Sequence, residues 1–110
     1  MKELSKAEKK LCRELIDKGI EAEFEAGIKN AEAIINKWKN KEMDNRTAYH
    51  AIHSEIRDHR KDLAFRYDGV TGSRYLDTVS YILADGFLTE DDIAGFSDDN
   101  RAYLKRFIRE

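Results

Sequence analysis

The chain has 110 residues, 38% of them Asp, Glu, Lys or Arg, and a formal net charge of −2 at pH 7. This length predicts one domain over residues 1–110, large enough to bury a hydrophobic core. A net charge so close to zero does not support a general electrostatic attraction to nucleic acid or anionic lipid. The apolar runs are far shorter than the ~20 residues of a membrane span, so we expect no membrane partner.

The cysteine content and the first residues of the chain indicate a cellular compartment. Cys12 is the only cysteine, so no internal disulfide can form. The first residues, Met1–Lys6, lack the apolar segment of a secretory signal. Both features predict the reducing cytoplasm. Because Cys12 follows Leu11 in a helical pattern, we expect a small, semi-buried hydrophobic residue rather than a nucleophile.

The sequence predicts helices throughout, because it has no proline, is rich in helix-forming residues and shows no two-residue alternation. The first helix is expected to begin at Ser5, which has capping-box spacing to Glu8. The second follows an apolar seam with four- and three-residue spacing: Phe24, Ile28, Ala31, Ile35 and Trp38. Extended backwards, this seam meets the charged Glu21 and Asp17, so we expect a bend or break near Gly19.

The second half of the chain repeats these helix signals. Asp44 or Asn45 is expected to cap a third helix that ends at Asp68-Gly69. A fourth helix, capped by Ser73, is the most apolar for its length and is expected to be central. A short helix after Thr89 and a last one capped by Ser97 complete the set. The sequence therefore predicts an irregular all-α bundle of about five to six helices.

One pair of residues is a candidate for catalysis. Arg46 and His53, on the third predicted helix, have six residues between them. This spacing resembles the arginine–histidine pair of HEPN-type helical ribonucleases, without placing the chain in that family. The resemblance implies that Arg46 would steady a phosphate while His53 moves a proton. No metal-binding motif is complete, so we expect no metal and no cofactor.

Two basic groups are candidates for binding. Trp38 lies between Lys37 and Lys39, an arrangement in which the indole stacks on a base while the lysines hold phosphate. Its place on the apolar seam favours a helix–helix interface instead. The second group lies on the third predicted helix and contains Arg57, Arg60 and Lys61. Acidic residues between them favour a solvated face.

The sequence as a whole is most typical of a non-catalytic cytoplasmic interaction or regulatory module. We expect a protein partner or self-association, for example a homodimer through the Phe24–Trp38 face. A nucleic-acid-binding helical module is the first alternative, and a small helical ribonuclease-like enzyme is the second.

Overall fold

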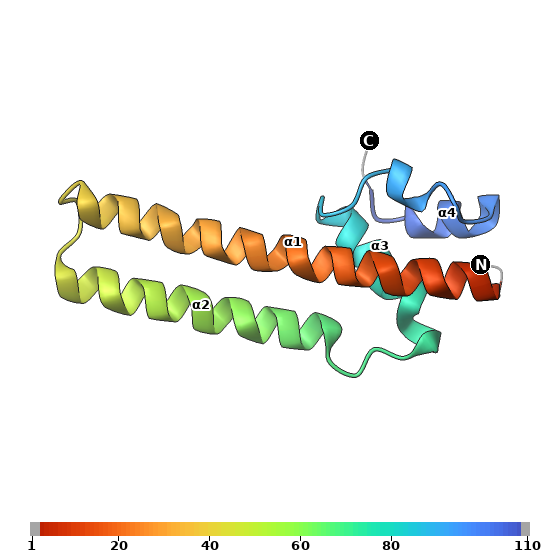
Figure 1. Cartoon of the computed structure of the whole chain (residues 1–110), viewed down its shortest axis with the longest axis horizontal. Helices are drawn as coiled ribbons and strands as arrows, with labels where there is room; N and C mark the ends of the chain where they lie inside the picture. The colour runs from red at the N-terminus through yellow and green to blue at the C-terminus, as the bar shows by residue number, and fades with distance from the viewer. Residues whose placement is uncertain (1–2, 109–110) are drawn as a thin grey trace. The chain divides into compact units, whose positions relative to one another are not determined.

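The computed structural model describes residues 3–108, and over that range the chain is helical with no β-strand (Figure 1). The described elements are α1 (Lys6–Lys39), α2 (Asn45–Tyr67), η1 (Gly72–Arg74), α3 (Tyr75–Ala84), η2 (Asp91–Ile93) and α4 (Asp98–Leu104). Here η marks a single turn of 3₁₀-helix. The all-α prediction is confirmed.

The expected five to six helices are wrong: the described residues form four α-helices. The predicted break near Gly19 is absent, because α1 continues from Lys6 to Lys39. A single glycine costs a helix only about 1 kcal/mol, which the rest of a 34-residue helix easily absorbs. The segment after Thr89 forms only the 3₁₀ turn η2.

The change of apolar seam within α1 has another cause than a break. The chain divides into two compact units, Met1–Glu21 with Gly69–Glu110, and Ala22–Asp68. We call them the core unit and the hairpin. The first part of α1 therefore packs in one unit and the second part in the other, so different neighbours decide which residues each part buries.

Most of the predicted helix ends are confirmed. Ser5 and Glu8 form a capping box, in which each backbone N–H donates to the other's side-chain oxygen at 3.1 Å. Asp44 caps α2 by accepting from the Thr47 backbone N–H at 2.7 Å, and Ser97 caps α4. The predicted cap at Ser73 is wrong, since Ser73 lies inside η1.

The core unit has a continuous hydrophobic interior. Its buried apolar residues from α1 and α3 are Cys12, Leu15, Ile16, Leu76, Val79, Ile82 and Leu83. Those from the following segments are Leu88, Ile93, Phe96 and Leu104. Helix α3 supplies the largest share and is central to this unit, as its composition predicts.

The hairpin consists of the second part of α1 and all of α2, which run side by side in opposite directions (Figure 1). Residues 40–44 form the connection, and Lys41 takes a positive φ of 62° there. Among the described residues 3–108, no helix is both long enough and apolar enough to cross a membrane.

Candidate interaction surface

Polar contacts fix how the two helices of the hairpin align. The Arg66 guanidinium donates to Glu23 Oε1 at 2.9 Å, and the Tyr67 hydroxyl donates to the same carboxylate. Midway along, the Asn30 amide donates to Glu55 Oε1 at 2.8 Å. Burial, reinforced by the bond to Glu23, raises the pKa of Tyr67. These pairs set which residue of α1 lies opposite which residue of α2.

The two helices of the hairpin pack tightly against each other at Gly27. A Cβ atom added there would lie 2.8 Å from the ring of His59, so the imidazole rests against bare backbone. Glycine in a helix interior carries an intrinsic cost of about 1 kcal/mol relative to alanine. The close packing of His59 supplies the reason for that glycine.

Almost nothing in the hairpin is buried. Of residues 22–68, only Gly27 and Ala48 are fully buried. Neither has a large side chain, so the hydrophobic stabilisation from complete burial is small. The isoleucines between the helices, among them Ile34, Ile35 and Ile52, are half-buried.

The large apolar residues of the hairpin gather on one face. On α1, Phe24 and Ile28 each come directly after a residue that contacts α2. On α2, Tyr49 and Ile56 each come directly after a residue that is turned toward α1. One step along a helix rotates the side chain by about 100°. Because the two helices run in opposite directions, that step turns both sets toward the same side. Together with Trp38 at the turn, these four residues are called the apolar face.

Residues of the apolar face are open to solvent. Ile28 is 66% exposed, Tyr49 74% and Phe24 48%, and Trp38 and Ile56 are also exposed. Phe65, the other exposed phenylalanine of the hairpin, precedes the contact residue Arg66 and therefore points to the opposite side.

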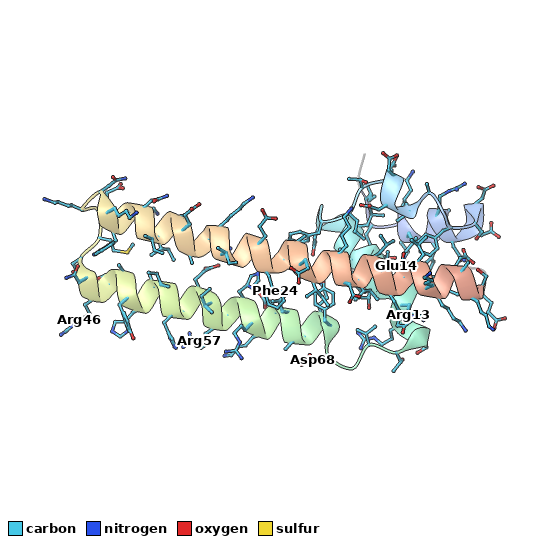
Figure 2. The ribbon with its side chains drawn as sticks, viewed as in Figure 1. Arg13, Glu14, Phe24, Arg46, Arg57 and Asp68 are labelled. Atoms are coloured by element: carbon cyan, nitrogen blue, oxygen red, sulfur yellow. The ribbon has the colours of Figure 1, made fainter. Side chains whose placement is uncertain are left out.

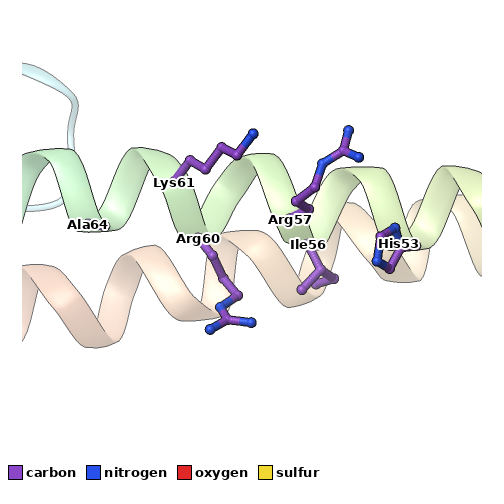
Figure 3. A pocket seen from close by; sticks show the side chains of 6 residues that line it. All are labelled: His53, Ile56, Arg57, Arg60, Lys61 and Ala64. Carbon is purple, nitrogen blue, oxygen red and sulfur yellow. The ribbon is translucent and has the colours of Figure 1, made fainter.

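Opposite charges lie along the two outer flanks of the apolar face. On α1, Glu25 and Glu32 are spaced seven residues apart and lie beyond Ile28 on its outer side. On α2 the corresponding outer flank carries Arg57 and Lys61. Figure 2 shows Arg57 on the side of α2 that is turned away from α1. Arg57 and Lys61 extend from the edge of α2 opposite Ile56 (Figure 3). We call these the acidic flank (Glu25, Glu32) and the basic flank (Arg57, Lys61).

The basic residues predicted for α2 line one open groove. It is formed by His53, Ile56, Arg57, Arg60, Lys61 and Ala64, all on α2. Figure 3 shows Arg57 and Lys61 extending from one edge of the helix, and Ile56 and Arg60 from the other. Three of the predicted binding residues, Arg57, Arg60 and Lys61, therefore line the same groove.

The candidate catalytic pair lies on one side of α2. Arg46 is in its first turn and His53 two turns later, and both are exposed. His53 lines the groove but Arg46 does not. Within the described residues 3–108, no third group holds either side chain by a hydrogen bond, the kind of contact that fixes a general base.

Trp38 and its two lysines lie at the end of the hairpin. The indole N–H donates to Asn45 Oδ1 at 2.7 Å, which ties the end of α1 to the start of α2. Trp38 and Lys39 also line an open pocket at the turn with Lys41, Met43 and Asp44. Lys37 is exposed on α1 and is not part of this pocket.

Glu8 has a role that its capping box alone does not predict. Its second carboxylate oxygen accepts from the Ser97 backbone N–H at 3.0 Å and from the Asn100 side-chain amide at 3.1 Å. The N–H of Ser97 lowers the pKa of Glu8 most, and the bonds from Asn100 and Ser5 add to this. One buried carboxylate therefore joins the N-terminal ends of α1 and α4.

Cys12 lies inside the core unit. Burial, together with the nearby negative charge of Glu8, raises the pKa of its thiol to about 11. A thiol with that pKa is almost fully protonated near pH 7, so Cys12 acts as a packing residue. In the described part of the chain, no three His, Cys, Asp or Glu side chains are grouped to hold a metal ion.

Comparison of the chain with protein-family models, curated proteins and solved structures found no match in any of the three. The function therefore has to be inferred from the geometry of the chain's own residues.

Proposed function

We propose that the chain is a non-catalytic protein-interaction module and that the hairpin binds the partner through its apolar face. The observation that carries this proposal is the exposure of Phe24, Ile28, Trp38, Tyr49 and Ile56 on one side of a unit that fully buries only Gly27 and Ala48. Contiguous exposed apolar residues with polar edges are typical of protein-binding sites.

The energetics favour a bound state. Full burial of one large apolar side chain contributes about 1.5–3 kcal/mol. The hairpin obtains little of this from its own two helices, while its exposed aromatic and isoleucine side chains offer several such contributions to a partner. Trp and Tyr, present here as Trp38 and Tyr49, are among the residues that carry most binding energy in protein interfaces. We place this module in the cytoplasm, where Cys12 stays reduced.

Two phenylalanines provide a matched test. A tagged chain is incubated with lysate from the source cells, with and without nuclease, and bound proteins are identified by mass spectrometry. Phe24→Ser removes a ring from the apolar face, whereas Phe65→Ser removes an even more exposed ring from the opposite side. We expect a nuclease-resistant protein, which can be an untagged copy of the chain, to be retained by Phe65→Ser and lost by Phe24→Ser. Equal binding to both variants would contradict the proposal.

Nucleic-acid binding is the second candidate, favoured by the groove that His53, Arg57, Arg60 and Lys61 line on α2. Each phosphate contact releases counterions, so such binding would weaken steeply as salt rises. Fluorescence anisotropy with labelled RNA and DNA oligonucleotides at two salt concentrations measures this. Arg57→Ala and Arg60→Ala should each reduce the salt slope by about one if the groove holds phosphates. Salt-independent or absent binding removes this candidate.

A further inference from the structure

We propose that the partner of the apolar face is a second copy of this chain, and that two hairpins pair face to face with α1 of each against α2 of the other. The inference rests on the proposed function, because it uses the same face. What it adds is the identity of the partner and the arrangement of the four helices.

The charges along the face select this arrangement. The acidic flank, Glu25 and Glu32, borders the face on α1, and the basic flank, Arg57 and Lys61, borders it on α2. A face with one acidic and one basic edge is complementary to itself. When two copies meet with a two-fold axis parallel to the helices, each acidic flank lies along the partner's basic flank.

A two-fold axis perpendicular to the helices gives the opposite result. It would place α1 against α1 and α2 against α2, so that acidic flanks would meet each other and basic flanks would meet each other. Like charges placed together disfavour that pairing. The parallel axis also makes every neighbouring pair of helices antiparallel, which is the ordinary geometry of a four-helix bundle.

The register follows from the contacts inside one hairpin. Glu23 lies opposite Arg66, and Asn30 lies opposite Glu55. A two-fold axis parallel to the helices keeps each residue at its position along the bundle, so the same offsets apply between the copies. Glu25 then lies near the level of the partner's Lys61, and Glu32 lies within about one helical turn of the level of the partner's Arg57.

These charges are free enough to respond to a partner. Within one hairpin, Glu25 makes an exposed ion pair with Lys29 at 3.2 Å, and Arg57 makes one with Asp58 at 3.3 Å. Both are surface pairs between near neighbours in the chain, the kind that contributes little to stability. Exchanging them for ion pairs between copies therefore costs little.

Charge reversal tests the arrangement on the full chain. The acidic flank is reversed in one variant, Glu25→Arg with Glu32→Arg, and the basic flank in another, Arg57→Glu with Lys61→Glu. Sedimentation equilibrium should show a wild-type dimer, and each variant alone should dissociate with a Kd raised at least about tenfold. An equimolar mixture of the two variants should recover the dimer, because both of its contacts then join opposite charges.

Circular dichroism of each variant controls for folding, since all four side chains lie on the surface. A wild-type chain that stays monomeric at high micromolar concentration overturns the inference. So do reversal variants that dimerise as tightly as the wild type, the outcome expected of the perpendicular axis. If the chain is monomeric but Phe24→Ser still abolishes capture of another protein, only the inference of a second copy fails. If Phe24→Ser has no effect on capture, the proposed function fails instead.

Discussion

The core unit and the hairpin solve the problem of burying apolar residues in opposite ways. In the core unit, Ile82, Val79 and Leu104 are 0% exposed, and one short helix is surrounded by the unit's other segments. In the hairpin, only Gly27 and Ala48 are buried, while Phe24 and Ile28 face solvent. Both units have similar helix-forming sequences. The difference shows that the core unit buries the apolar sides of its helices against one another, whereas the hairpin leaves part of its apolar side exposed to solvent.

The largest loss of stability is expected from a substitution in the interior of the core unit. Ile82→Ala removes a fully buried side chain and leaves a cavity, so we expect a loss of about 3–4 kcal/mol in the free energy of unfolding. The matched change in the hairpin is Ile28→Ala, where the side chain is 66% exposed. In dilute solution it should cost within about 0.5 kcal/mol. Urea denaturation of both variants at low protein concentration measures the contrast.

A loss of several kcal/mol in dilute Ile28→Ala would show that the hairpin packs this residue within a single chain. Conversely, a cost for Ile28→Ala that appears only as protein concentration rises would show that the residue is buried by association.

The next effect concerns the polar contact that holds the core unit together. Glu8→Ala removes the acceptor for the Ser5 and Ser97 backbone N–H groups and for the Asn100 amide. Donors that lose a buried acceptor are costly, so we expect destabilisation of about 2–3 kcal/mol. The control is Glu14→Ala on the same helix, which loses only an exposed pair with Lys10. Thermal unfolding that is equal for the two variants would contradict the role assigned to Glu8.

Sequence patterns predict those parts of the molecule that depend on near neighbours. The helix caps at Ser5, Asp44 and Ser97 are confirmed because a cap involves residues only a few positions apart. The positive φ values at Gly69 and Gly86 follow the same logic. The predicted break at Gly19 is wrong because a change of seam was taken as a change of backbone. In fact one continuous helix, Lys6–Lys39, belongs to two units and meets different neighbours in each.

The candidate surface is only half visible in the sequence. The seam from Phe24 to Trp38 is readable from its spacing, but its exposure is not, since that depends on how little α2 covers. The acidic and basic flanks require the alignment of Glu23 with Arg66 across 43 residues of chain. A search for charges at seven-residue spacing beside an apolar seam would have identified Glu25 and Glu32.

Low pH is expected to destabilise the core unit through two of its carboxylates. The pKa of Glu8 is lowered in the folded chain by the N–H of Ser97, and that of Asp92 is lowered by Lys18. The unfolded chain therefore takes up these protons at a higher pH than the folded chain does. The resulting stability is fully present above the ordinary Glu value of about 4.3 and is lost as pH falls through the lowered pKa values.

Glu8→Gln should flatten this dependence. We expect the melting temperature of the wild type to fall more steeply with acid below about pH 4.5 than that of the variant, with the two curves converging at the acid end. Differential scanning fluorimetry over a pH series records both curves. Parallel curves would mean that Glu8 binds protons equally in the folded and unfolded chain. Glu14→Gln, on an exposed carboxylate, controls for the change in net charge.

The smallest effect tests the one close contact within the hairpin. Gly27→Ala improves helix propensity by about 1 kcal/mol, but the new Cβ would meet the His59 ring. That distance is 2.8 Å, so the ring or the helices must move, and we expect the gain to be cancelled or reversed. In a His59→Ala background the obstacle is gone, and Gly27→Ala should stabilise the chain by up to about 1 kcal/mol.

The exposed His50→Ala provides the control background, in which Gly27→Ala should behave as in the wild type. Hydrogen exchange of the hairpin amides measures the local stability of the wild type, the two single variants and the double variant. A Gly27→Ala effect that is the same with and without His59 would mean that the two helices do not hold this contact in solution, and the alignment that sets the flanks opposite each other would lose its support.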